Sequence, residues 1–279
     1  MKEVNEFSFD KQNMRQVLLD FPRQLEFNPR IKEIQEIEKA ILAGMGGSAL
    51  PGRLANCIIG KKVVEIHNDY GLPKTADENT LVIACSYSGN TEETLDSLAK
   101  ALERKCKVVC VSSGGELEKI AFEKKLPIVK IPSGLQPRMA SGFATAAVLN
   151  ILSAAKICKD YTNEFHEAKI TLEEEKTSIE KKGKELAEAI SDHVPIIYAS
   201  EANEVVAFVA KIKFNENSKT PAFYNVFPEL NHNEMNGFTN SPASFHFFFL
   251  EDDSDNEAVK KRMKITKELL EERKLALGI

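Results

Sequence analysis

Short apolar runs alternate with longer amphipathic runs along the first half of this 279-residue chain. Short apolar runs are typical of buried strands, whereas apolar residues at three- and four-residue spacing are typical of helices that cover a sheet. Strands are predicted at Ala40–Ala43, Val63–Ile66, Thr80–Cys85, Lys107–Val111 and Pro127–Lys130. Helices are predicted at Ala49–Ile59, Glu92–Leu102, Glu116–Lys124 and Met139–Lys156. The alternation predicts an α/β fold in which helices cover both faces of a parallel, flavodoxin-like sheet.

The same rhythm returns in the second half, after a long charged helical stretch at Glu164–Ile190. Further strands are predicted at Val194–Ala199, Thr220–Asn225 and Phe245–Leu250, and further helices at Ala202–Phe214 and Asn256–Arg273. We therefore predict two αβα sandwich domains with parallel sheets. The first spans residues 1–160, with N-terminal helices near Met14–Leu19 and Pro29–Lys39, and the second spans residues 161–279. The chain stops at residues 275–279, just after a predicted helix, and another strand and helix would be expected next. We therefore expect the second domain to be incomplete at its C-terminus.

A loop rich in hydroxyl groups joins the strand Thr80–Cys85 to the helix that follows, and its sequence is Ser86-Tyr87-Ser88-Gly89-Asn90-Thr91. A helix start offers free backbone N–H groups and the positive end of its dipole, and Ser and Thr add short neutral donors. The loop therefore predicts a site for a small phosphate. An ordinary capped helix is the alternative, because capping needs only one such hydroxyl. No Gly-Lys-Ser/Thr ending follows, which disfavours a Walker-type nucleotide site.

A second glycine turn follows the strand Ala40–Ala43 and has the sequence Gly44-Met45-Gly46-Gly47-Ser48. It matches a dinucleotide fingerprint only loosely, because Ala49 stands where the last glycine would fall. In a parallel sheet both turns open at the carboxyl ends of the strands, where open α/β sheets bind ligands. Two hydroxyl-bearing turns at one edge favour a ligand site over simple capping.

Composition narrows the functional classes. The net charge of −5 gives no general attraction for nucleic acid or an anionic membrane. No apolar run approaches the roughly 20 residues of a membrane helix, and the N-terminus lacks the apolar core of a signal peptide. The five cysteines lack C-x-x-C spacing, so they fit buried thiols of a cytoplasmic protein rather than a disulfide frame or a zinc site.

Three further polar residues are candidates for chemistry. Glu216 stands near a predicted helix C-terminus, where the dipole disfavours a carboxylate unless it is solvated or useful as a base. His232 lies between two asparagines and can serve as acid or base near neutral pH. Arg138 precedes the helix Met139–Lys156, where its charge opposes the dipole unless it faces an anion. The alternatives are a surface glutamate, a histidine in a structural hydrogen bond and a surface arginine.

Taken together, these motifs resemble one family. They are Gly46-Gly47-Ser48, Ser86-Tyr87-Ser88-Gly89-Asn90-Thr91-Glu92-Glu93-Thr94, Pro137-Arg138, Asn215-Glu216-Asn217-Ser218-Lys219 and Asn231-His232-Asn233-Glu234. In order and spacing they resemble the bifunctional phosphoglucose/phosphomannose isomerases of archaea and some bacteria, which are built from two sugar-isomerase (SIS) domains. The resemblance runs from about residue 35 to the end of the chain.

The resemblance implies isomerisation of glucose 6-phosphate, and of mannose 6-phosphate, to fructose 6-phosphate through a cis-enediolate. Glu216 would be the base, Arg138 would stabilise the enediolate, and His232 would assist ring opening from the partner subunit of a homodimer. The phosphate would be bound by Gly47, Ser48, Ser86, Ser88 and Thr91. The resemblance implies a sugar phosphate as the partner and no metal, cofactor, nucleic acid or membrane.

Members of the family continue past the last predicted helix with a strand, a lysine-bearing helix and a threonine-proline tail. The resemblance therefore implies a C-terminal segment that is missing from these residues, since Lys264, Lys267 and Lys274 belong to the preceding helical pattern. A SIS protein that binds or senses phosphosugars without turning them over is the alternative function. An aminosugar transferase is disfavoured, because the start of the chain has no cysteine nucleophile.

Overall fold

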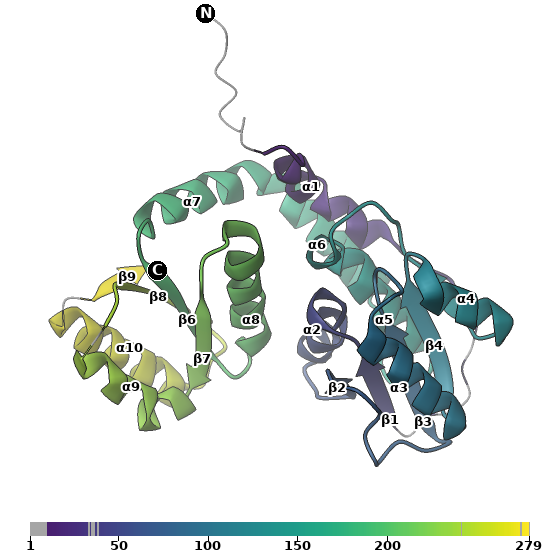
Figure 1. Cartoon of the computed structure of the whole chain (residues 1–279). Helices are drawn as coiled ribbons and strands as arrows, with labels where there is room; N and C mark the ends of the chain where they lie inside the picture. Colours follow the sequence, from purple (N-terminus) through teal and green to yellow (C-terminus); the bar gives the residue numbers. More distant parts are fainter. Residues whose placement is uncertain are drawn as a thin grey trace, which may run out of the picture. The chain divides into compact units, whose positions relative to one another are not determined.

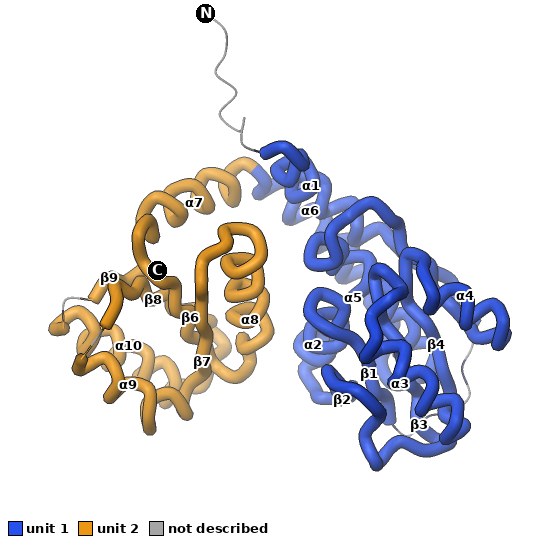
Figure 2. The backbone as a smooth tube through the Cα atoms, viewed as in Figure 1, with its two compact units in different colours: residues 1–176 blue, residues 177–279 orange. Residues whose placement is uncertain are grey.

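The computed structural model describes residues 10–278 apart from residues 33, 35, 36, 38, 241 and 274. It divides into two compact units, Met1–Lys176 and Thr177–Ile279 (Figures 1 and 2). Each unit contains its own parallel sheet and its own buried core. The prediction of an α/β fold with two parallel sheets is therefore confirmed.

The first unit is built on a five-stranded parallel sheet with the order β2-β1-β3-β4-β5. Its strands are β1 (Lys39–Ala43), β2 (Val64–His67), β3 (Thr80–Cys85), β4 (Lys107–Ser112) and β5 (Ile128–Lys130). This is the flavodoxin-like order, in which the chain reverses its direction of travel between the first and third strands. The crevice at that reversal lies between the loops that follow β1 and β3, which are the two hydroxyl-bearing turns.

Helices cover both faces of this sheet, and the side chains of β3 alternate between them. Leu81 and Ile83 pack in the same core cluster as helices α2 (Leu50–Ile59) and α5 (Ser141–Ala154). Val82 and Ala84 point to the opposite face. That second face is covered by α3 (Glu92–Glu103) and α4 (Gly115–Glu123), through Leu98, Ala101, Leu117 and Ala121. A strand buried on both faces needs apolar residues throughout, which explains why the sequence locates it so well.

The segment before β1 is where one predicted helix is wrong. A helix at Met14–Leu19 is confirmed as α1, but the described residues of Pro29–Lys39 lie outside helices, and Lys39 opens β1. Residues 33, 35, 36 and 38 lie outside the described residues. Ile31 and Ile34 pack against the core, and the Ile34 N–H donates to the Ala154 carbonyl. The isoleucine spacing is helical in the sequence, but packing against the core overrides it.

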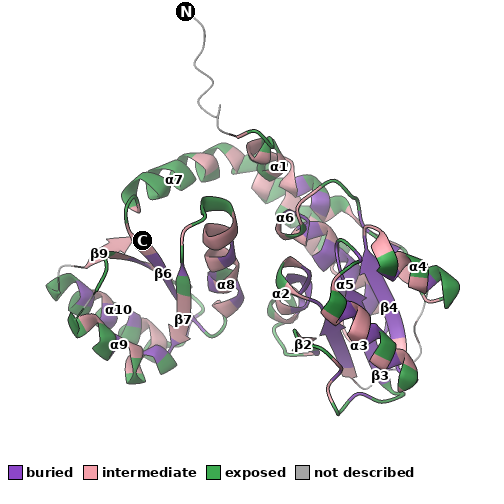
Figure 3. Cartoon of the chain, viewed as in Figure 1, coloured by how far each residue is buried: buried purple, intermediate pink, exposed green. Residues whose placement is uncertain are grey.

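The charged stretch that follows α5 in the sequence forms two helices rather than one, α6 (Thr162–Glu174) and α7 (Lys176–Ala189). They are interrupted at Glu175. Most residues of α7 are exposed, as Figure 3 shows, so its charges form a solvated surface. None of the described helices combines the length and the apolar character needed to cross a membrane.

The second unit has a four-stranded parallel sheet with the order β7-β6-β8-β9. The strands are β6 (Val194–Ser200), β7 (Phe223–Phe227), β8 (Phe245–Leu250) and β9 (Ala276–Gly278). Helix α8 (Glu204–Lys213) packs on β6 and β7, and α10 (Glu257–Glu272) contacts β7 and β9. Between β7 and β8 lie short helical turns, including η5 (Glu229–His232) and α9 (Glu234–Gly237).

Two details of the second sheet differ from the sequence prediction. The strand predicted at Thr220–Asn225 is shifted to Phe223–Phe227. Residues 220–222 lie outside helices and strands, and the Ala222 N–H donates to Asn215 Oδ1 at 2.8 Å instead of to a neighbouring strand. The prediction placed no strand after the last helix, yet Ala276–Gly278 pairs with β8. This segment is too short for its apolar pattern to identify it as a strand.

Candidate active site

Backbone close contacts shape the loop after β3. Gly89 has a φ of +73°, and a Cβ there would lie 1.8 Å from the Gly114 carbonyl oxygen, so only glycine fits. The Ser86 hydroxyl accepts a hydrogen bond from the Gly89 N–H at 3.1 Å and hydrogen-bonds the Thr91 hydroxyl at 2.8 Å. Ser86 is fully buried, whereas Ser88 is exposed and Thr91 half-buried. Ser86 therefore shapes the loop from within, Thr91 shares a hydrogen bond with it, and Ser88 is exposed.

The loop after β1 joins this structure through Ser48. Its buried hydroxyl accepts a hydrogen bond from the Tyr87 backbone N–H at 3.0 Å. Strands β1 and β3 pair in parallel, with Ala43 opposite Ala84. The expectation that both turns open at one edge of the sheet is thus met by a direct hydrogen bond between them.

Arg138 belongs to the same corner of the first unit. It lies in a single 3-10 turn, η3 (Pro137–Met139), directly before α5. A Cβ on Gly47 would lie 2.9 Å from the Arg138 backbone nitrogen, so these two backbones are in contact. The structure therefore brings Gly47, Ser48, the Ser86–Thr91 loop and Arg138 together.

Two residues that the sequence analysis left without a role hold these segments. The buried Tyr87 side chain donates to the Pro132 carbonyl at 3.0 Å and accepts from the Leu135 N–H at 2.8 Å. Burial raises the pKa of its hydroxyl, which keeps the group neutral, so it can both donate and accept. Gln24 is also buried; it donates to the Met139 carbonyl at 2.7 Å and accepts from the Gly142 N–H at 3.1 Å. The sequence could have pointed to Tyr87, because a tyrosine stands out among small hydroxyl residues, but nothing in the sequence pointed to Gln24.

Glu216 lies in the second unit, in a π-helical turn at Phe214–Ser218 that continues α8. Single π turns are frequent at functional sites. The turn is closed by Lys219, whose φ is +57° and whose ammonium donates to the Glu216 carbonyl at 2.8 Å. The Glu216 side chain is half-buried, and the predicted position near a helix C-terminus is confirmed.

His232 ends η5 and is exposed. The flanking asparagines hold the loop: Asn231 donates to the Thr266 hydroxyl at 3.0 Å, and Asn233 donates to the Glu229 carboxylate at 3.2 Å. Just beyond them, Glu234 is bound by two residues of the sheet. The Tyr198 hydroxyl donates to one carboxylate oxygen at 2.7 Å, and the Asn225 amide donates to the other. Burial and then the hydrogen bond to Glu234 raise the pKa of Tyr198 far above its ordinary value.

The Glu216 and His232 segments pack on opposite faces of the second sheet. Phe214, at the start of the π turn, stacks on Phe248 and belongs to the cluster under α8. Leu230, in the turn of His232, belongs to the other cluster with Tyr198 and Phe247. Figure 1 shows α8 and α9 on the two sides of β6 and β7. Within one chain, the sheet therefore stands between the segment that carries Glu216 and the segment that carries His232.

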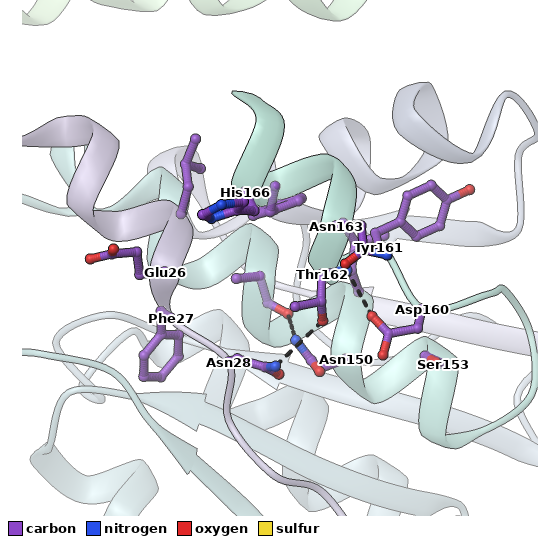
Figure 4. Close-up of a pocket in the computed structure, with 14 residues that line it drawn as sticks. Glu26, Phe27, Asn28, Asn150, Ser153, Asp160, Tyr161, Thr162, Asn163 and His166 are labelled. Atoms are coloured by element: carbon purple, nitrogen blue, oxygen red, sulfur yellow. Dashed lines mark hydrogen bonds between the residues drawn. The ribbon is translucent and has the colours of Figure 1, made fainter. Parts of the chain in front are cut away.

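A cavity of about 310 Å³ lies elsewhere in the first unit. It is lined by the end of η1 (Phe21–Glu26) and the two residues that follow it, by one side of α5, and by residues 160–166, which lead into and begin α6 (Figure 4). Asn28 donates to the Thr162 hydroxyl at 3.4 Å, and the Thr162 N–H donates to Asp160 at 2.7 Å. None of the residues predicted for phosphate binding or catalysis lines it.

Comparison with known proteins agrees with this architecture. Residues 33–149 match the family model described as SIS domain, and residues 179–277 match the bacterial phospho-glucose isomerase C-terminal SIS domain. The C-terminal domain of glucosamine-fructose-6-phosphate aminotransferase from Francisella tularensis superposes with a TM-score of 0.69 at 17% identity, covering 95% of this chain and 82% of that one. At that identity the likeness concerns the fold alone. The fold and the hydroxyl-bearing loops define a protein built from two SIS domains.

Sequence relatives narrow this class. The chain is 36% identical over 262 residues to the bifunctional phosphoglucose/phosphomannose isomerase of Aquifex aeolicus, covering 92% of this chain and 80% of the relative. It is 37% identical over 251 residues to the enzyme of that name from Caldicellulosiruptor bescii, covering 85% and 74%. The chain belongs to the bifunctional phosphoglucose/phosphomannose isomerase family, which confirms the resemblance stated from its motifs.

Proposed function

We propose that this protein interconverts glucose 6-phosphate and fructose 6-phosphate through a cis-enediolate, and that it also accepts mannose 6-phosphate. The observation that carries the proposal is the contact between Gly47 and Arg138, which sets a guanidinium-bearing segment beside two hydroxyl-bearing loops. In a chain of this family, that arrangement suits a substrate with a phosphate at one end and a developing oxyanion at the other.

The phosphate is bound at the carboxyl edge of the first sheet. The hydroxyls of Ser88 and Thr91 and the N–H groups at the start of α3 are its donors. Ser48 keeps its own proton free to donate while it accepts from the Tyr87 N–H, and Ser86 supports the loop. Neutral donors at a helix start suit a phosphate monoester without a metal ion.

Proton transfer involves Glu216 and Arg138. Glu216 removes the proton from C2 of the open-chain aldose, and the electron pair forms the C1=C2 double bond while the negative charge moves to O1. Arg138 stabilises that charge. Return of the proton from Glu216 to C1, with transfer of the O2 proton to O1, leaves the ketose. Loss of the C2 stereocentre in the enediolate is why glucose and mannose phosphates can share the site.

His232 assists the earlier step by moving a proton between the ring oxygen and O1 when the sugar ring opens. We propose that it acts from the partner subunit of a homodimer. The placement of Glu216 and His232 on opposite faces of the second sheet supports this arrangement, because a two-fold dimer can supply one group from each copy.

The proposed setting is the cytoplasm, with sugar phosphates as partners and neither nucleic acid nor membrane. The five cysteines are free thiols, as expected in a reducing compartment. Cys85, Cys106 and Cys110 are buried as predicted, whereas Cys57 is exposed and Cys158 half-buried. Burial raises the pKa values of Cys85 and Cys110 to about 12, so both remain protonated and unreactive.

A coupled assay of the purified protein with both aldose phosphates tests the reaction, and transfer of hydrogen between C2 and C1 in deuterated water tests its route. Glu216→Gln keeps the shape of the side chain and removes the base, so turnover should be lost while fructose 6-phosphate still stabilises the protein against heat. Thermal stabilisation of the wild-type protein by sugar phosphates without any isomerisation would instead favour a sensor or binding protein.

A further inference from the structure

Tyr87 makes contacts in three directions from the middle of the Ser86–Thr91 loop (the phosphate loop). Its backbone N–H donates to the Ser48 hydroxyl, and its carbonyl accepts from the Ser113 N–H at 3.0 Å. Its side-chain hydroxyl lies at the other end of the residue, between the Pro132 carbonyl and the Leu135 N–H. Tyr87 is 8% exposed, and its bond to Ser48 is buried, whereas the two bonds of its hydroxyl are partly buried.

The segment that this hydroxyl holds leads directly to Arg138. Residues 131–136 lie outside helices and strands, and Gly134 has a φ of +94°. A six-residue connection of this kind has few backbone hydrogen bonds of its own to fix it. The Tyr87 hydroxyl supplies two hydrogen bonds to this segment, one on each side of Gly134. The bond to Leu135 lies only three residues before Arg138.

The residues that follow Arg138 in the sequence are also held by hydrogen bonds. Gln24 binds the Met139 carbonyl and the Gly142 N–H, and α5 begins at Ser141. The phenol of Tyr87 therefore ties the approach to Arg138 to the loop that would hold the phosphate. This connection adds to the backbone contact between Gly47 and Arg138.

We propose that Tyr87 is a positioning residue for Arg138: its hydroxyl fixes the Pro132–Leu135 segment so that the guanidinium stands at a set distance from the phosphate loop. The inference rests on the proposed function, because it takes the roles of Arg138 and the loop from there. It predicts that loss of the hydroxyl weakens binding of the enediolate end of the substrate and leaves binding of the phosphate end unchanged.

Tyr87→Phe tests the proposal, because it removes one oxygen and preserves the buried ring. We expect kcat to fall about tenfold as Arg138 loses its fixed position, with KM within about twofold of wild type. Inorganic phosphate and 5-phosphoarabinonohydroxamate, whose planar hydroxamate imitates an enediolate, are titrated separately by calorimetry. Affinity for the hydroxamate should fall about tenfold and that for phosphate should not change. Tyr161→Phe, a half-buried tyrosine at the cavity of Figure 4, is the matched control.

A double-mutant cycle with Arg138→Ala separates positioning from a general structural effect. If Tyr87 acts through Arg138, adding Tyr87→Phe to Arg138→Ala should cause no further loss of hydroxamate affinity. Fully additive losses, or a Tyr87→Phe protein that binds the hydroxamate like wild type, would overturn the inference. So would an equal loss of phosphate affinity, since the whole loop would then be disturbed.

The two proposals fail in different ways. If the wild-type protein binds both molecules but isomerises no sugar phosphate, the proposed function fails, and the two affinities still decide the role of Tyr87. If the wild-type protein binds neither molecule, both proposals are wrong. Comparison of melting temperatures shows whether each variant is folded before it is titrated.

Discussion

The hydroxyl oxygen of Ser48 accepts a hydrogen bond from the backbone N–H of Tyr87 at 3.0 Å. This bond joins the loop after β1 to the loop after β3 at the point where the order of the first sheet reverses. Because Ser48 is buried, this hydrogen bond holds the two loops in a fixed position relative to each other. The proposed phosphate site therefore depends on both loops.

Replacement of Ser48 by alanine should remove this hydrogen bond between the two loops. The Tyr87 N–H loses its acceptor, and an unsatisfied buried donor costs about 1 to 3 kcal/mol. We expect lower stability and roughly tenfold weaker binding of inorganic phosphate, measured by chemical denaturation and calorimetry. Ser153→Ala, on the part of α5 that borders the cavity, is the control and should change neither property. Unaltered phosphate affinity in Ser48→Ala would show that the first loop takes no part in binding.

Substitution of Gly89 should destabilise the fold strongly. A Cβ there would overlap the Gly114 carbonyl, and the residue has a positive φ, so Gly89→Ala should lower the free energy of unfolding by at least about 2 kcal/mol. Gly183→Ala is the matched comparison, because Gly183 is exposed on α7 with open space at its Cβ position. Its substitution should stabilise that helix by up to about 1 kcal/mol. Equal effects of the two substitutions would contradict the described loop geometry.

The hydrogen bonds of Gln24 indicate that the start of α5 depends on a side chain far away in the sequence. Gln24→Ala leaves the Met139 carbonyl and the Gly142 N–H without their partner, which should lower the free energy of unfolding by about 2 to 4 kcal/mol. Gln16→Ala, at an exposed position of α1, should have almost no effect in the same denaturation experiment. A small loss at Gln24 would mean that water or another group replaces the amide.

Most strands could be predicted from the sequence, whereas several contacts that shape the site could not. Strand β3 is buried along its whole length, and such a strand is visible as an uninterrupted apolar run. The isoleucines before β1 were misleading, because their spacing of three suits a helix, yet Ile31 and Ile34 pack against the core without forming one. Tyr87 and Gln24 bind backbone groups more than forty and more than one hundred residues away. No local pattern encodes such partners.

Two histidines in the second unit should make the stability of the fold depend on pH. His246 is buried on β8, neither ring nitrogen has a hydrogen-bond partner among the described residues, and His193 lies against its ring. Burial, and then the nearby His193, lower the pKa of His246. The unfolded chain therefore binds this proton at a higher pH than the folded chain, and stability should fall as the pH drops below about 6.5.

The variant His246→Leu removes the titrating group, so it should flatten the stability profile between about pH 5 and 7. Denaturation midpoints across that range measure the effect. His166→Asn, at an exposed position of α6, should keep the wild-type profile. If His246→Leu retained the full slope, another group would be responsible.

The positions of Glu216 and His232 on opposite faces of the second sheet predict that two inactive variants can restore each other. In a homodimer whose sites take Glu216 from one copy and His232 from the other, Glu216→Gln and His232→Ala are each inactive alone. A mixed dimer contains one site with both defects and one with neither. After unfolding and refolding of an equal mixture, half of the dimers are mixed, so about a quarter of wild-type activity should return. Size-exclusion chromatography confirms that dimers form, and refolding each variant alone is the control. If mixed dimers form without activity, both groups must come from the same chain, and the arrangement across the dimer is wrong.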